Sequence, residues 1–202
     1  MSECQPTFIN TQVFNPNNVG FMKKRAMISP LSGVPKLYIE KEKRTLSIET
    51  MRLQEIKQIN QVVEIIPGLF LGSASNVPNI CNKIGAILNI THENSMCSHL
   101  DHSDIIYLSI PIDDTINQNI LNYFDITYDF INRYIGSGIY VHCAQGISRS
   151  PTIVIAYLMR KNNIGLVEAL SMVKSKRPCI CPNIDFLGNL LIFEQKLHVN
   201  PI

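Results

Sequence analysis

The order of apolar segments in this chain predicts an α/β fold, with a central, mainly parallel sheet flanked by helices. Short runs rich in β-branched residues, at 86–90, 105–110 and 139–141, have the composition of buried strands. Longer stretches with helical spacing of apolar residues lie between or after them, at 118–135 and 150–160. Strands that alternate with helices in this way form a parallel sheet with helices on its faces.

The chain of 202 residues divides at about residue 58. Residues 1–58 are polar, interrupted by prolines and glycines, and contain a weakly helical stretch near their end, so we expect a flexible or loosely docked extension. Residues 59–202 are expected to form one domain of average size. Within the extension, residues 43–48 have the basic-then-apolar pattern of a kinase-docking peptide, although a solvated charge run is the simpler interpretation.

The other predicted elements begin at residue 64. Pro67-Gly68 separates two apolar runs, which is typical of two strands joined by a turn. A helix that ends before Pro178 is predicted after the helix at 150–160, since proline cannot continue it. In chain order, these further elements are the strand pair at 64–73 and helices at 74–83, 165–176 and 182–198.

Residues 141–151 carry the most informative pattern, Val-His-Cys-Ala-Gln-Gly-Ile-Ser-Arg-Ser-Pro. A predicted strand precedes Cys143 and a predicted helix follows it, so the cysteine stands in a tight loop that ends at a helix N-terminus. Backbone N–H groups of such a loop converge on an anion, and the helix dipole adds about half a positive charge. The same field favours the nucleophilic thiolate form of the cysteine. Arg149 adds a fork of donors that can hold two phosphate oxygens at once.

This segment resembles the HCxxGxxR[S/T] loop of the cysteine-dependent protein phosphatases, and its continuation resembles the dual-specificity branch of that family. The resemblance covers roughly residues 63–198 and implies the cysteine-phosphatase fold. It implies Cys143 as nucleophile, Arg149 as phosphate clamp, and Ser150 as hydrogen-bond donor to the sulfur leaving group. His142 would orient the loop. The residues implied to bind phosphate are Ala144, Gln145, Gly146, Ile147, Ser148 and Arg149.

A phosphatase of this kind also needs an acid that protonates the leaving oxygen and then serves as a base. Asp113 and Asp114 follow the predicted strand at 105–110 and precede the cysteine by about thirty positions. The family pattern I-P-[IV]-x-D aligns its acid with Asp114. Asp113 is the competing candidate, and an ordinary helix N-cap carboxylate is the non-catalytic interpretation of either residue.

Composition narrows the substrate class. The net charge of +2 argues against a broad nucleic-acid footprint, and no apolar stretch has the length of a membrane span. The interior of the loop carries no basic residue besides Arg149, whereas inositol-lipid phosphatases place additional cations there. The chain has no tryptophan and so lacks the Trp-Pro-Asp acid loop of the tyrosine-only branch. We therefore expect hydrolysis of phosphotyrosine and of phosphoserine or phosphothreonine.

The expected partners are phosphorylated proteins, with a MAP kinase as one candidate, and neither nucleic acid nor a membrane. No cofactor is expected, and the six cysteines have no zinc-ligand or disulfide-scaffold spacing. A thiolate nucleophile needs a reducing compartment, which predicts an intracellular protein, in the cytoplasm or nucleus. Two alternatives stay open: a phosphatase acting on RNA 5′ phosphate, lipid or carbohydrate, and a module that binds phosphoproteins without turnover.

Overall fold

The computed structural model describes residues 47, 49–51, 53, 56, 57, 59–92 and 105–199, all of which belong to the compact unit Lys43–Ile202. The predicted extension at 1–58 lies outside the described residues except for the few positions from 47 onward, which are helical. The candidate docking peptide at 43–48 lies outside them except for residue 47. No helix among the described residues is long and apolar enough to cross a membrane.

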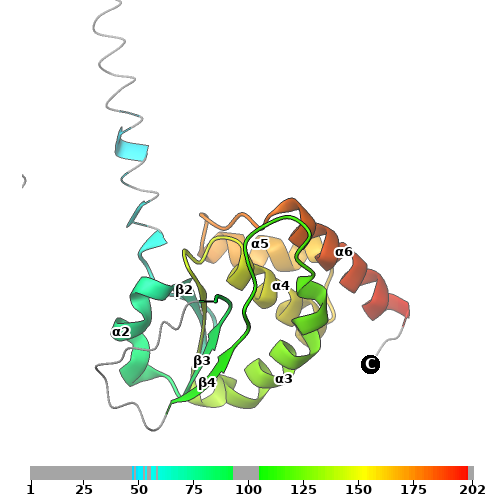
Figure 1. Ribbon diagram of the computed structural model, residues 1–202, viewed down its shortest axis with the longest axis horizontal. Helices are drawn as coiled ribbons and strands as arrows, with labels where there is room; N and C mark the ends of the chain where they lie inside the picture. The colour runs from blue at the N-terminus through cyan, green and yellow to red at the C-terminus, as the bar shows by residue number, and fades with distance from the viewer. Residues whose placement is uncertain are drawn as a thin grey trace, which may run out of the picture. The chain divides into compact units, whose positions relative to one another are not determined.

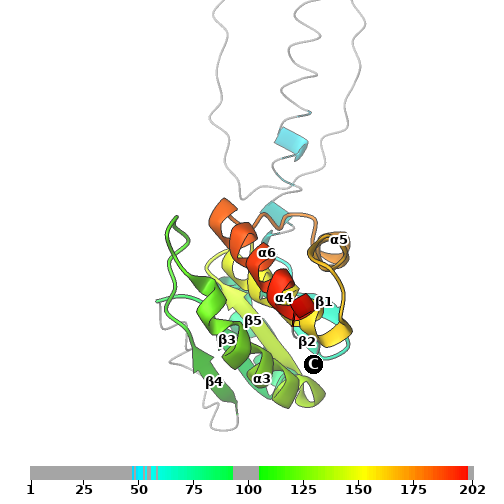
Figure 2. The same ribbon diagram turned by 90° about the vertical axis from the view of Figure 1, so that its right-hand side faces the viewer.

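Five strands of the described residues form a single sheet in the order β1-β2-β5-β3-β4 (Figures 1 and 2). The strands β2, β5, β3 and β4 are parallel, whereas β1 pairs antiparallel with β2 across the turn at Gly68. The predicted mainly parallel sheet is therefore confirmed. The strand bounds are β1 Val63–Ile66, β2 Leu69–Ser73, β3 Ala86–Asn89, β4 Ile106–Ser109 and β5 Ile139–Cys143.

Helices cover both faces of this sheet. The short α2 (Val77–Ile80) lies on one face, over a small core that includes Ile87 and Tyr140. Four longer helices lie on the other face, as Figures 1 and 2 show. Their bounds are α3 Phe124–Tyr134, α4 Arg149–Asn162, α5 Leu166–Lys176 and α6 Ile184–Val199.

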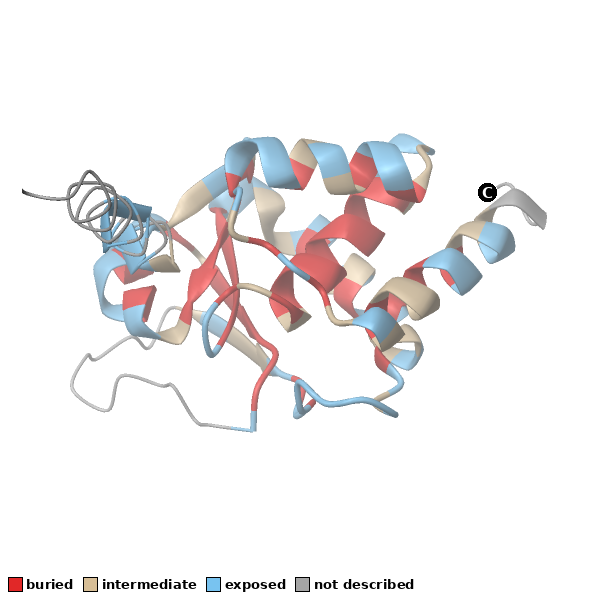
Figure 3. Cartoon of the chain, turned by 90° about the horizontal axis from the view of Figure 1, so that it is seen from above, coloured by how far each residue is buried: buried red, intermediate tan, exposed pale blue. Residues whose placement is uncertain are grey.

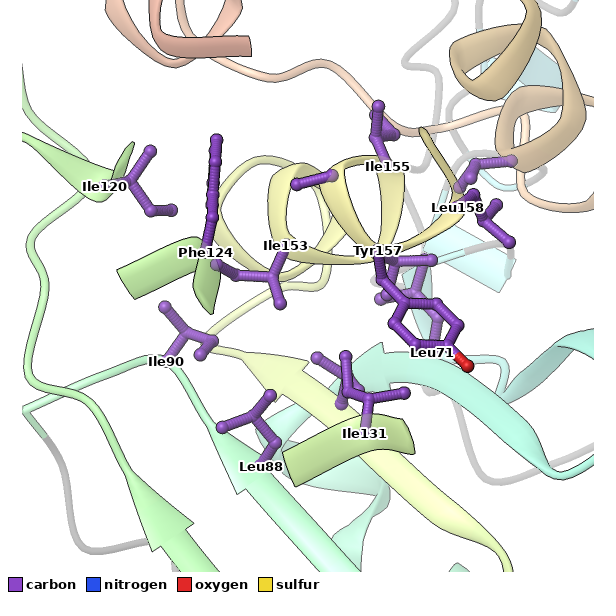
Figure 4. Close-up of a cluster of buried hydrophobic side chains, with 14 of the residues drawn as sticks. Leu71, Leu88, Ile90, Ile120, Phe124, Ile131, Ile153, Ile155, Tyr157 and Leu158 are labelled. Carbon is purple, nitrogen blue, oxygen red and sulfur yellow. The ribbon is translucent and has the colours of Figure 1, made fainter. Parts of the chain in front are cut away.

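The helix α4 is the centre of the larger core. Ten consecutive residues, from Ser150 to Met159, are buried, which is typical of a helix enclosed on all sides (Figure 3). Side chains of α4 meet side chains from α3, β2 and β3 in Figure 4. Because α4 begins directly after the loop that follows β5, this packing fixes the position of the loop and of the first turn of the helix.

Two helices differ from the sequence expectation. The stretch at 74–83 is divided into the 3₁₀ turn η1 (Ala74–Asn76), α2, and a second 3₁₀ turn, η2 (Cys81–Lys83). Pro78 stands in the first turn of α2, where it cannot donate a backbone hydrogen bond, so the helix starts anew there. The helix predicted at 118–135 begins as η3 (Ile120–Tyr123), shortly after Asn117, whose backbone N–H donates to Asp185 on α6.

Candidate active site

Cys143 is the last residue of β5, and its side chain is buried. Two hydrogen-bond donors converge on its sulfur: the backbone N–H of Gly146 and the hydroxyl of Ser150, each 3.2 Å from Sγ. Donors aimed at a sulfur stabilise its thiolate form, and they stabilise it equally when it is a leaving group.

Gly146 turns the loop back toward α4. Its φ of +69° lies in the left-handed region, and a Cβ at this position would collide with the carbonyl oxygen of Gly72 on β2. Glycine is therefore required here both by conformation and by space. The loop of residues 143–149, which we call the phosphate-binding loop, is pressed closely against the end of the sheet.

Arg149 is the first residue of α4 and lies at the side of the pocket. Its Nη1 donates to the carbonyl oxygen of Ile112 at 2.8 Å, and its Nε lies 3.9 Å from Asp114 Oδ2. Among the described residues, the buried Nε–H has no hydrogen-bond acceptor. Arg149 is thus fixed by one hydrogen bond and keeps its Nε–H available for a ligand. Because it also lies at the N-terminus of a 14-residue helix, it is suited to bind an anion.

The structure separates the two adjacent carboxylates. Asp114 Oδ1 accepts from Ser148 Oγ at 2.7 Å and from Asn183 Nδ2 at 2.9 Å, so this carboxylate stands over the phosphate-binding loop. Asp113 points elsewhere and lies 3.4 Å from His92 Nε2, where both side chains are more than half exposed. Of the two candidates, Asp114 is the one beside the cysteine and the arginine.

The segment that carries Asp114 is fastened to the start of α6. The backbone N–H of Asn117 donates to Asp185 Oδ2 at 2.6 Å, and that of Leu121 donates to Asn189 Oδ1 at 3.2 Å. Together with the bond from Asn183 to Asp114, these contacts hold residues 114–121 along the first turns of α6. We call residues 110–119 the acid loop.

These groups surround one open pocket of about 500 Å³. Three of the residues implied by the resemblance do not line this pocket: His142, Gly146 and Ser150. Among the lining residues, Arg149 is the only cation and Asp114 the only carboxylate. The lining residues are Asp114, Cys143, Ala144, Gln145, Ile147, Ser148, Arg149, Cys181 and Asn183.

His142 lies beneath the loop and is fully buried. Burial lowers the pKa of His142 to about 4, so the imidazole is neutral at pH 7. Its ring stacks on Tyr140 with centroids 5.5 Å apart, and the Tyr140 hydroxyl donates to the Ser73 carbonyl at 2.7 Å. His142 is thus part of the packing that supports the loop.

The sequence patterns assign no site role to two residues of this region: Asn183, which lines the pocket beside Cys181, and Arg177, which lies behind the loop. Asn183 follows a proline and starts the last helix, a position from which a side chain can reach a neighbouring loop. Arg177 stands at the end of α5 next to Pro178, a position that ordinarily places a cation in solvent. No pattern in the sequence indicates that it is buried.

This combination of fold and loop defines a cysteine-phosphatase domain. More particularly, the chain belongs to the family described as "Dual specificity phosphatase, catalytic domain", which residues 69–196 match. Dual specificity protein phosphatase 1-A of Xenopus laevis is 40% identical over 141 residues, which cover 67% of this chain and 37% of that protein. Human dual specificity protein phosphatase 9 is 39% identical over 143 residues, which cover 68% and 37%.

A solved structure agrees. The human tyrosine phosphatase-like serine/threonine/tyrosine-interacting protein has a TM-score of 0.62 and is 30% identical, with coverage of 69% of this chain and 98% of that one. The chain spans little more than a third of the length of the curated relatives named above. Family and fold are thereby shown, and the roles of single residues stay predictions.

Proposed function

We propose that this protein is a dual-specificity protein phosphatase that works through a phosphocysteine intermediate on Cys143. The observation that carries the proposal is the meeting, in one pocket, of a buried cysteine sulfur with two donors, the N-terminus of α4, Arg149 and Asp114. The family assignment supports the same reaction class.

In the first step, the Cys143 thiolate attacks phosphorus, and the bond from phosphorus to the ester oxygen breaks. Asp114, in its protonated form, gives the departing oxygen a proton. Arg149 and the backbone N–H groups of the loop bind the equatorial oxygens, on which negative charge gathers in the transition state. The products are a phosphocysteine and a free hydroxyl group.

In the second step, the Asp114 carboxylate takes a proton from water, and the resulting nucleophile attacks phosphorus. The sulfur–phosphorus bond breaks, and the sulfur leaves as a thiolate that accepts hydrogen bonds from Ser150 and Gly146. Inorganic phosphate is released. No metal or cofactor takes part in either step.

The pocket supports a substrate with one phosphate on a protein side chain. Apart from Arg149, the described residues that line the pocket are neutral or acidic. The pocket lining therefore offers no second cation that could bind a further phosphate group. Its open form suits both the long phosphotyrosyl side chain and the shorter phosphoseryl and phosphothreonyl side chains. We place the protein in a reducing intracellular compartment, with a phosphorylated protein kinase among the candidate substrates.

A panel of substrates tests the proposal. Phosphate release from the purified full chain is measured with a phosphotyrosyl peptide, a phosphothreonyl peptide, a phosphoinositide and a 5′-phosphorylated RNA. We expect turnover of both peptides, with phosphate recovered on Cys143 by mass spectrometry after rapid acid quenching. Preference for the lipid or the RNA would favour the alternative substrates, and binding of the peptides without turnover would show a binding module instead.

A further inference from the structure

Arg177 lies directly behind the phosphate-binding loop, and its side chain is 1% exposed. Its Nε donates to the carbonyl oxygen of Gly146 at 2.9 Å, and its Nη2 donates to that of Gln145 at 3.2 Å. The guanidinium is therefore bonded to two consecutive peptide units of the loop, on the side opposite the pocket.

Those two peptide units carry two of the backbone N–H groups of the loop. In a trans peptide the C=O and the N–H point in opposite directions, and the described backbone contains no cis peptide. The Gln145 carbonyl shares its plane with the Gly146 N–H, which donates to Cys143 Sγ. The Gly146 carbonyl shares its plane with the Ile147 N–H. By holding both carbonyls from behind, Arg177 turns both N–H groups away from itself, toward the sulfur and the pocket.

The same guanidinium also holds residues 59–61, which we call the leading segment because they come just before β1. Nη1 donates to the carbonyl of Gln61 at 2.7 Å, and Nη2 donates to that of Ile59 at 3.0 Å. The carbonyl between them, on Asn60, accepts from Asn76 Nδ2 at 2.9 Å. Three successive carbonyls of the leading segment are thus bound by two side chains of the domain.

Asn76 connects this arrangement to the sheet at the level of the cysteine. Its Oδ1 accepts from Ser73 Oγ at 2.8 Å, and Ser73 pairs with Cys143 across β2 and β5. The leading segment and the phosphate-binding loop are consequently attached to one hydrogen-bonded unit, in which Arg177 is the direct link.

We propose that Arg177 is a positioning residue that couples the leading segment to the phosphate-binding loop, so that the placement of the leading segment sets oxyanion affinity at Cys143. The effect on turnover rests on the proposed function, whereas the effect on oxyanion binding does not. A planar fork with five donors is needed to reach four carbonyls in two segments, and the single ammonium of lysine cannot span them.

The variants Arg177→Lys and Arg177→Met of the full chain test this, with Lys176→Met as matched control. Lys176 is the exposed neighbour, and its removal takes away one positive charge without touching the link. Three quantities are measured: the dissociation constant of tungstate, kcat/KM for an aryl phosphate, and the pH dependence of Cys143 alkylation by iodoacetamide. Tungstate serves as a phosphate analogue that needs no turnover.

We expect Arg177→Lys to weaken tungstate binding and lower kcat/KM by about 10- to 100-fold, the size of effect that a displacement near 1 Å produces. The alkylation profile should shift to higher pH, because the Gly146 N–H no longer points at the sulfur. Lys176→Met should leave all three quantities unchanged. A folded Arg177→Lys with wild-type tungstate affinity and alkylation profile would overturn the proposal.

Asn76→Ser keeps the proposal testable if both Arg177 variants fail to fold. Its shorter side chain cannot reach the Asn60 carbonyl and also loses the bond from Ser73 Oγ, whereas Arg177 keeps its own bonds to the loop. We expect tungstate binding to weaken roughly five-fold, the equivalent of one neutral hydrogen bond. Unchanged tungstate affinity would refute the coupling. If the wild-type chain binds tungstate but hydrolyses no phosphate ester, the proposed function fails while the coupling is still decided by the tungstate measurements.

Discussion

Replacing Asp114 by asparagine removes the carboxyl group that we propose as proton donor and leaves its surroundings in place. The amide oxygen of Asp114→Asn can still accept from Ser148 Oγ and Asn183 Nδ2, which lie 2.7 and 2.9 Å from Oδ1 in the wild type. The acid loop therefore stays fastened to α6, and what is lost is general acid–base catalysis. That contribution is about 10²- to 10⁴-fold, or about 3–5 kcal/mol of transition-state stabilisation.

The measurement compares leaving groups. With a phosphothreonyl peptide, whose alkoxide leaves poorly, we expect kcat to fall by the full amount. With p-nitrophenyl phosphate, whose leaving group needs no proton, the first step should be nearly unaffected and its burst retained. Asp113→Asn is the matched control, because Asp113 is exposed beside His92, and it should keep kcat within about two-fold. A large loss in Asp113→Asn with none in Asp114→Asn would show that the acid is assigned to the wrong residue.

Three further predictions concern the loop and its support. Cys143→Ser should abolish phosphate release yet still bind phosphopeptide in a calorimetric titration, since the backbone donors and Arg149 remain; measurable turnover would contradict the mechanism. Gly146→Ala should lower the unfolding free energy by about 1–3 kcal/mol in urea and abolish tungstate binding, because φ is +69° and a Cβ meets the Gly72 carbonyl. The pKa of His142 is about 4 when folded and about 6.5 when unfolded, so the unfolded state binds more protons between these values and stability rises with pH there. His142 should therefore contribute a loss of up to about 3 kcal/mol as pH falls from 6.5 to 4, and urea unfolding of His142→Gln should show a correspondingly shallower pH dependence.

The sheet, the central helix and the loop could be predicted from the sequence because their signals are local. The buried strand begins with a continuous apolar run at 139–141, and the loop pattern that follows specifies spacing, glycine and arginine together. The broken helix at 74–83 could not be placed as well. Helical periodicity does not reveal that Pro78 and tertiary packing divide such a stretch into an α-helical turn between two 3₁₀ turns.

The supporting parts of the site depend on contacts between distant segments. Arg177 meets Gly146 at a separation of 31 residues and Ile59 at a separation of 118, and no spacing rule connects such positions. The choice between Asp113 and Asp114 was reached from a family pattern, whereas the structure distinguishes them by the direction of each side chain. Apart from His142, which the family resemblance assigned to orienting the loop, the contacts that hold the cysteine loop in place were not visible in the sequence.

The fastening of the acid loop to α6 makes the last helix of the domain part of the proposed active site. Asn183, Asp185 and Asn189 each hold one point of residues 114–121, and none of these three bonds involves the cysteine loop backbone. The start of α6 is also bonded to the phosphate-binding loop, because the Asn183 N–H donates to Ser148 Oγ at 3.1 Å and the nearby Cys181 N–H donates to the Ile147 carbonyl at 2.8 Å. A shift of the first turns of α6 should therefore displace the carboxylate of Asp114 and the phosphate-binding loop together, so that residues that never touch the substrate affect turnover and phosphate affinity jointly.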